Sequence, residues 1–219
     1  MSEYAGELIM REKKGILIVV SGFSGAGKGT LMKKLMQDYD NYALSISATT
    51  RQPRVEEEDG REYFFRTKEE FEKMIARDEL IEYARYVENY YGTPKQYVME
   101  QLEAGKDVIL EIEIQGARKI KKKFPEAVLV FVTAPSMEVL RERLVGRGTE
   151  TAEVIHQRLA RAAQEAEGVD EYDYVLVNDQ LDEAVDRLHG IIQSEHFSMK
   201  RNLDFIHEIQ AQAARFTEE

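Results

Sequence analysis

The fold is decided by Gly22-Phe23-Ser24-Gly25-Ala26-Gly27-Lys28-Gly29-Thr30, which follows the apolar run 16–22 and opens a segment with apolar residues every three or four positions. A strand, a glycine-rich turn ending in lysine and a helix form the phosphate-binding P-loop. Glycines let backbone N–H groups turn inward around a polyphosphate, the helix N-terminus adds its positive dipole end, and Lys28 supplies a mobile cation. All residues from Gly22 to Thr30 are therefore expected to surround nucleotide phosphates.

One position departs from the usual P-loop. Gly29 follows Lys28, where serine or threonine commonly supplies a hydroxyl to Mg2+. That hydroxyl is then missing or displaced to Thr30, which makes Thr30 a candidate metal ligand.

Short apolar runs alternate with amphipathic segments along the rest of the chain. This alternation predicts an α/β fold, a three-layer P-loop core with a central parallel sheet. The expected strands are 16–22, 43–48, 108–114, 127–133 and 174–177, and the expected helices are 28–39, 94–104, 117–124, 137–146, 152–167 and 181–194. Residues 48–93 interrupt the pattern and predict a small α+β insertion, in which Thr67 and Glu70 form a capping box at a helix start.

Composition excludes several classes of protein. The 219 residues carry a net charge of −11, which argues against a nucleic-acid-binding surface. The absence of cysteine excludes disulfides, thiolate catalysis and cysteine zinc sites, and the four histidines lack metal-ligand spacing. With no apolar run of membrane-spanning length and no secretory signal, we expect a cytoplasmic protein that binds neither nucleic acid nor membrane.

Three further segments identify the kind of phosphate binder. They are Ser45-Ile46-Ser47-Ala48-Thr49-Thr50-Arg51-Gln52-Pro53-Arg54, Asp59-Gly60-Arg61-Glu62-Tyr63, and Tyr90-Tyr91-Gly92-Thr93-Pro94, with Glu82 before the last. With the P-loop, they closely resemble the guanylate kinase family from about residue 15 to about residue 192. The resemblance implies transfer of a phosphoryl group from ATP to GMP, and use of dGMP as well, in purine nucleotide metabolism.

The resemblance also assigns the acceptor site. It implies that the GMP phosphate is bound by Arg51, Arg54, Tyr63 and Tyr91, and that the guanine edge is read by Ser47, Glu82 and Thr93. Chemically, two guanidinium groups suit a phosphate dianion, and a carboxylate accepts from guanine N1–H and the 2-amino group, donors that adenine does not offer together. Two alternatives stay open: Thr93 as the N-cap of the helix at Pro94, and the tyrosines as ordinary strand aromatics.

A pair of glutamates follows in the segment Leu110-Glu111-Ile112-Glu113-Ile114. If the strand runs to residue 114, its alternation puts Glu111 and Glu113 on one face, at the ligand-binding end of the sheet. The family has aspartates at both positions, one organising Mg2+ and its waters and the other near the GMP base and ribose. The resemblance therefore makes Glu111 a candidate metal ligand and both glutamates GMP-site residues.

The arginine-rich stretch 140–166 resembles the lid of the family. Arg147 and Arg158 match the lid arginines that close over the ATP phosphates, and Arg158 is also expected to contact GMP. Asn178 matches a segment near the adenine, where a turn is the alternative role. Phosphoryl transfer needs positive charge where the transition state spreads negative charge, so Lys28, Arg51, Arg147 and Arg158 are the predicted catalytic residues. The basic run Arg118, Lys119, Lys121, Lys122 and Lys123 is expected to be a solvated helix face.

The sequence thus predicts an ATP:GMP phosphotransferase that uses ATP and Mg2+ and exists as a monomer or homodimer. Two alternatives remain: a kinase for another nucleoside monophosphate, and a catalytically inactive guanylate-kinase-like interaction domain. The expected parts are an N-terminal extension 1–14, a core at 15–47, 94–139 and 167–194, a GMP-binding insertion 48–93, a lid 140–166 and a helical tail 195–219.

Overall fold

The computed structural model describes residues 14–54, 57–86, 88–146 and 152–216. Arg147 and nearly all of the N-terminal extension lie outside these residues. None of the described helices is long and apolar enough to cross a membrane.

The core is a five-stranded sheet with the strand order β2-β7-β1-β8-β9, in which every neighbouring pair is parallel. Its strands are β1 (Leu17–Gly22), β2 (Tyr42–Leu44), β7 (Asp107–Glu111), β8 (Val128–Thr133) and β9 (Tyr174–Val177). Their continuous apolar runs are typical of strands covered on both faces. The predicted fold class is confirmed.

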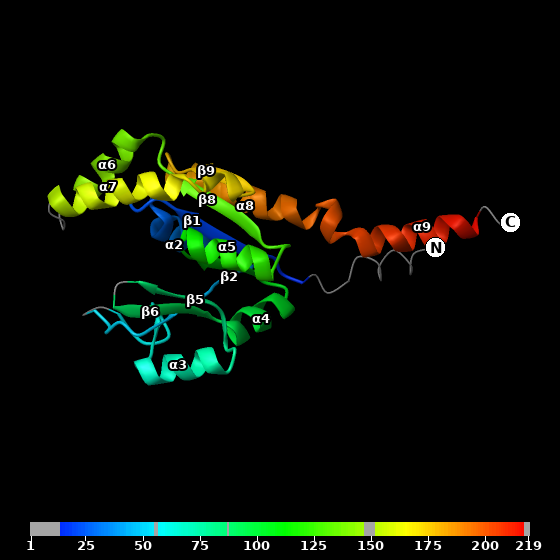
Figure 1. Ribbon diagram of the computed structural model, residues 1–219. Helices are drawn as coiled ribbons and strands as arrows, with labels where there is room; N and C mark the ends of the chain where they lie inside the picture. The colour runs from blue at the N-terminus through cyan, green and yellow to red at the C-terminus, as the bar shows by residue number, and fades with distance from the viewer. Residues whose placement is uncertain (1–13, 55–56, 87, 147–151, 217–219) are drawn as a thin grey trace.

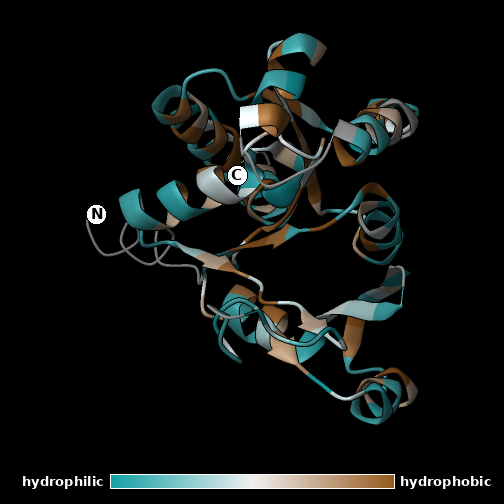
Figure 2. Ribbon diagram, turned by 90° about the vertical axis from the view of Figure 1, so that its left-hand side faces the viewer, coloured by the Kyte–Doolittle hydropathy of each residue, from teal (hydrophilic) through white to brown (hydrophobic). Residues whose placement is uncertain are grey.

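Helices cover both faces of this sheet and complete three layers (Figure 1). Ile18 and Val20 of β1 pack toward α2 (Lys28–Asp38) and α8 (Leu181–His196). Leu17 and Val19 pack toward α4 (Lys95–Glu103) and α5 (Ile114–Lys123). Figure 2 shows the hydrophobic residues gathered on the core strands and hydrophilic residues on the outer faces of the helices.

The insertion forms a second sheet with the order β4-β3-β6-β5. Its elements are β3 (Ala48–Thr49), β4 (Phe64–Phe65), α3 (Lys68–Ala76), β5 (Leu80–Tyr86) and β6 (Asn89–Pro94), around a small core of Ala48, Phe71 and Leu80. The predicted capping box is confirmed: Glu70 N–H donates to Thr67 Oγ1 at 3.1 Å, and Thr67 N–H donates to Glu70 Oε2 at 2.8 Å.

The remaining helices lie at the two ends of the core (Figure 1). At one end, α6 (Met137–Gly146) and α7 (Ala152–Ala166) form the arginine-rich segment. Toward the other end, α8 leads through a short 3-10 helix, Met199–Arg201, into α9 (Leu203–Arg215), which extends away from the core. A second 3-10 helix, Val169–Glu171, connects α7 to β9.

Two predicted strands are wrong at their ends. The expected strand 43–48 divides into β2, in the core sheet, and β3, in the insertion sheet. The expected strand 108–114 stops at Glu111, because the Glu113 side chain accepts the Gly116 N–H at 3.2 Å and caps α5, which starts at Ile114. A local capping bond therefore replaces strand alternation after Glu111.

Candidate active site

The phosphate loop joins the end of β1 to the start of α2. Gly25 and Gly27 have φ values of 94° and 86°, a left-handed conformation that favours glycine. Phe23 and Ala26 are buried, and the Phe23 ring packs edge-on against Phe131. Their side chains therefore anchor the loop to the core, which leaves the loop backbone to face a ligand.

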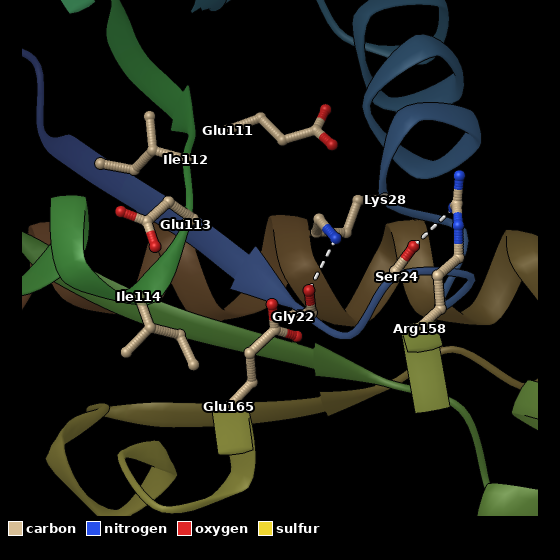
Figure 3. A pocket seen from close by; sticks show the side chains of 9 residues that line it. All are labelled: Gly22, Ser24, Lys28, Glu111, Ile112, Glu113, Ile114, Arg158 and Glu165. Atoms are coloured by element: carbon tan, nitrogen blue, oxygen red, sulfur yellow. Dashed lines mark hydrogen bonds between the residues drawn. The ribbon is translucent and has the colours of Figure 1, made fainter. Parts of the chain in front are cut away.

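Lys28 folds back over its own loop (Figure 3). Its Nζ donates to the carbonyl oxygens of Gly22 at 2.7 Å and Phe23 at 3.2 Å. Gly29 and Thr30, the last predicted loop residues, are exposed on the first turn of α2. The loop thus presents the ammonium group, and not these two residues, to the adjoining cleft.

The first cleft has a volume of about 400 Å³ and is lined by Gly22, Ser24, Lys28, Glu111, Glu113, Arg158 and Glu165, among others (Figure 3). Arg158 reaches it from α7, and its Nη1 donates to Ser24 Oγ at 2.8 Å. The structure therefore brings the arginine-rich segment onto the phosphate loop through Arg158. Arg147, the other predicted lid arginine, lies outside the described residues.

A second cavity of about 230 Å³ lies on the insertion side of the same sheet edge. Its lining includes Ser47, Tyr63, Glu82, Tyr91, Glu113 and Gly116. Glu111, Ile112 and Glu113 line both cavities. Although Glu113 lies beyond the strand and the predicted alternation is wrong, the two glutamates still stand together where the cavities meet.

Glu111 is open to the solvent of the first cleft, and its side chain extends from the end of β7 toward the side where Lys28 lies (Figure 3). Desolvation by the cleft walls raises the pKa of the Glu111 carboxyl, and the positive charge of Lys28 opposes that rise.

Glu82 is the buried carboxylate of the second cavity. Its side chain projects from β5 and is 8% exposed. Thr93 Oγ1 donates to Glu82 Oε1 at 2.9 Å, while Gly116 lies so near that a Cβ there would be 3.3 Å from Glu82 Oε2. Burial raises the pKa of the Glu82 carboxyl, and the hydrogen bond from Thr93 counteracts this effect.

The alternative role of Thr93, as the N-cap of the following helix, is wrong. The N-cap of α4 is Pro94, without a side-chain capping bond, so Thr93 does not cap this helix. Because its hydroxyl proton goes to Glu82, Thr93 in this arrangement orients the carboxylate and does not donate to a base.

Of the two predicted phosphate-binding arginines of the insertion, the structure places the side chain of Arg51, but not that of Arg54, among the other site residues. Arg51 Nη2 bonds the Glu57 carboxylate at 2.8 Å, and the Arg51 guanidinium lies 5.2 Å from the centre of the Tyr63 ring. Burial lowers the pKa of Arg51, but the contacts with Glu57 and Tyr91 outweigh it and raise the pKa above its usual value. Arg54 donates its backbone N–H to Glu57 at 2.8 Å, while its side chain is exposed.

Glu57 is the residue of this cluster that sequence reasoning missed. It holds both arginines, through the side chain of Arg51 and the backbone of Arg54. The available signal was its place in the acidic run 56–59, which begins two residues after Arg54.

Asn178 lies beyond the end of β9 and is 5% exposed. Its side-chain Nδ2 donates to the Ala26 carbonyl at 2.8 Å, and the backbone carbonyl of Asn178 accepts from Arg143 Nη1 at 2.8 Å. Asn178 therefore holds the phosphate loop against the end of β9. Its predicted proximity to adenine stays a prediction.

Comparison with known proteins agrees with this geometry. Residues 14–195 match the family model described as "Guanylate kinase". A guanylate kinase of Halalkalibacterium halodurans is 50% identical over 200 residues, covering 91% of this chain and 98% of the relative. One from Lactococcus lactis is 51% identical over 201 residues, with the same shares. The crystal structure of guanylate kinase from Anaplasma phagocytophilum superposes with a TM-score of 0.70 at 32% identity, covering 86% of this chain and 90% of that one.

Proposed function

The chain belongs to the guanylate kinase family, and from that premise we propose that it transfers the γ-phosphoryl group of ATP to GMP along one continuous cleft. The observation that carries this proposal is the sharing of Glu111, Ile112 and Glu113 by the two cavities. One cavity presents the cations that suit a triphosphate, and the other presents a buried carboxylate that suits guanine. A donor and an acceptor bound in them would meet at the end of β7.

The donor end is built on the phosphate loop. Lys28 would exchange the carbonyl oxygens of Gly22 and Phe23 for phosphate oxygens, and Arg158 would exchange the Ser24 hydroxyl. Both groups then stabilise the negative charge that spreads over the transferred phosphoryl group. We assign the same part to Arg147, and a place beside the adenine to Asn178.

The acceptor end is built on the insertion. Arg51 and Arg54 would bind the GMP phosphate, with the hydroxyl groups of Tyr63 and Tyr91 beside them. For this, the phosphate replaces Glu57 as the partner of Arg51. Glu82 would accept from guanine N1–H and the 2-amino group, with Ser47 nearby to donate to O6.

The Mg2+ that accompanies ATP fits one residue of this site. Among the described residues, no cluster of His, Cys, Asp and Glu side chains could enclose a metal ion. Carboxylate oxygen is nonetheless a ligand that Mg2+ accepts alongside water and phosphate, and Glu111 offers one across the cleft from Lys28. Thr30 is not among the residues that line the cleft. Mg2+ bound to ATP neutralises part of the phosphate charge, and Glu111 would hold it.

Transfer in this site requires no nucleophile from the protein. The chain aligns the two phosphates, supplies charge and excludes water, because an open cleft allows ATP to react with water instead of GMP. We assign these movements to the lid, 140–166, and the GMP-binding insertion, 48–93, around the core. Use of dGMP, a cytoplasmic location and a monomeric or dimeric state complete the proposal.

The acceptor decides between this proposal and its alternatives. A site that pairs the polar edge of its substrate rejects an analogue without that edge by roughly 10⁴-fold. We therefore expect ADP formation from ATP and Mg2+ with GMP, and very little with AMP, CMP or UMP. Comparable use of AMP would refute the base-reading role of Glu82, and folded protein without turnover would indicate the interaction domain.

Replacing Lys28 tests the donor end. Lys28→Ala should lower kcat by roughly 10²–10³-fold, as the loss of one transition-state charge does, without unfolding the protein. Lys33→Ala is the matched control, because Lys33 is exposed on the same helix and faces neither cavity. Retained turnover in Lys28→Ala would contradict the mechanism.

A further inference from the structure

The basic face of α5 is largely exposed, as the sequence predicted, but two of its lysines also bond the backbone of the insertion. Lys119 Nζ donates to the Tyr83 carbonyl at 2.6 Å, and Lys123 Nζ donates to the Ile81 carbonyl at 2.9 Å. The two lysines are one helical turn apart, and the two carbonyls belong to the residues on either side of Glu82. The core helix therefore holds the insertion strand at the guanine-reading residue.

These carbonyls are available to α5 because β5 is the edge strand of its sheet. The Glu82 carbonyl oxygen faces β6, because a Cβ at Gly92 would lie 3.0 Å from it, in the stretch where the register between β5 and β6 shifts. The carbonyls of Ile81 and Tyr83 point the other way, toward α5. An edge strand leaves such backbone groups without a strand partner, and ammonium groups of α5 bind two of them here.

The same boundary is incompletely filled by side chains. Ile81 is buried against the core, but beside it lies a cavity of about 370 Å³ lined by Glu82, Tyr83, Lys119 and Lys123, among others. Ile81 shares the buried apolar cluster with Ala117 and Ile120 of α5, and the ammonium-to-carbonyl bonds join the two elements on the side where the cavity lies. The two kinds of contact together set the place of β5 relative to α5.

The N-terminal part of α5 is what Glu82 faces across the second cavity. Gly116, in the first turn of α5, lies beside Glu82 Oε2, and Glu113 caps the same helix. A shift of β5 along α5 would change the distance between Glu82 and the groups that the core contributes to the guanine site, among them Glu113 and Gly116.

We propose that Lys119 and Lys123 are positioning residues for guanine recognition, holding β5 against α5 so that the Glu82 carboxylate stays at its place beside Gly116. This inference rests on the proposed role of Glu82 as the guanine reader. The lysines have a second effect, because their charges counteract the rise that burial causes in the Glu82 pKa, while Glu113 adds to that rise and Thr93 opposes it.

The test is the double variant Lys119→Met/Lys123→Met, which keeps the apolar stems and removes the donors and charges. We expect KM for GMP to rise roughly tenfold and the preference for GMP over AMP to fall, with KM for ATP unchanged. Lys119→Arg/Lys123→Arg retains charge and donors and should restore most of the GMP affinity. An unchanged KM for GMP, or an equal rise for both substrates, would overturn the proposal.

Lys122→Met is the matched control. Lys122 lies on the same helix between the two lysines, is exposed and lines the same cavity, but it donates to no carbonyl among the described residues. It should leave both KM values unchanged. Thermal unfolding of every variant distinguishes loss of the fold from displacement of Glu82 in a folded protein. If the double variant is unfolded, Lys119→Met and Lys123→Met are measured separately.

Glu82→Gln separates this inference from the function it rests on. If Glu82→Gln leaves the preference for GMP intact, the guanine-reading role itself is wrong. If Glu82→Gln abolishes the preference and the lysine variant does not reduce it, only the role of the lysines is wrong. In the combined variant, we expect less than the sum of the two effects, because the lysines act through Glu82.

Discussion

The cations of the cleft bind oxygen atoms of the protein in the places where we expect phosphate oxygens. Lys28 donates to the Gly22 carbonyl and Arg51 to the Glu57 carboxylate. Substrate binding therefore exchanges one set of hydrogen bonds for another, and each exchange contributes less free energy than an isolated bond would. The internal partners keep the long side chains in the cleft, which lowers the entropy that binding must remove.

The Glu82 carboxyl should make GMP binding sensitive to pH. Only the ionised carboxylate accepts from both guanine donors. Because burial raises the pKa of Glu82, that form is lost at a higher pH than for an ordinary glutamate. We expect KM for GMP to rise as the pH falls from about 7 to about 5.

The control for this pH profile is Glu82→Gln. The GMP phosphate itself titrates at about pH 6, and it contributes equally to the profiles of the unmodified protein and the variant. Subtracting the profile of the variant therefore isolates Glu82. Identical profiles for the two proteins would show that Glu82 does not titrate in the binding reaction.

At the scale of elements, the junction between β1 and α2 depends more on Gly27 than on Gly29. Gly27 is the N-cap of α2 with a φ of 86°, and a Cβ there would lie 2.6 Å from Asn178 Nδ2. We expect Gly27→Ala to lower the free energy of unfolding by more than about 1 kcal/mol and to weaken ATP binding.

Gly29→Ala is the matched comparison for stability. A Cβ at Gly29 would have no neighbour within 4 Å, and the residue lies inside α2. Alanine there should raise the free energy of unfolding by about 0.5–1 kcal/mol. Chemical denaturation of both variants checks the pair, and equal losses would contradict the strained geometry at Gly27.

The elements that could be predicted from the sequence are those with a local cause. The P-loop, the buried strands and the capping box at Thr67 depend on spacings within one segment, and the structure confirms them. The end of β7 and the start of α5 could not be placed, because a side-chain cap from Glu113 competes there with strand alternation.

The partners of single residues were less predictable than the elements. Thr93 binds a carboxylate from the neighbouring strand, and Lys119 and Lys123 bind carbonyls far away in the sequence. Nothing in the local pattern distinguishes such side chains from a helix cap or a solvated face. The sequence indicates where the substrates should bind more clearly than what holds the site in place.

At the scale of the whole molecule, the C-terminal helix contributes little to the folded core. No residue of α9 is buried. Deletion of residues 203–219 should therefore shift Tm by less than about 2 °C and leave turnover unchanged. Thermal unfolding and ADP formation check both parts, and a large loss in either would mean that α9 packs on the core in solution or joins two copies.

The contrast lies a few residues earlier, at the end of α8. His196 Nε2 lies 3.0 Å from Asp107, a buried carboxylate that also accepts the Ile16 N–H at 2.8 Å. We expect His196→Ala to lower the free energy of unfolding by about 1–3 kcal/mol, because Asp107 loses a partner. Chemical denaturation measures the loss. A change as small as that expected for the deletion would show that the contact between His196 and Asp107 does not stabilise the core.

The central claim is that donor and acceptor occupy one cleft that is continuous at Glu111 and Glu113. Calorimetric titration with adenosine and guanosine joined through one polyphosphate chain tests this claim most directly. We expect a single analogue per chain, binding at least about 10²-fold more tightly than ATP or GMP and preventing both from binding. Protein saturated with the analogue that still binds GMP would contradict the claim, because the two cavities would then be separate sites.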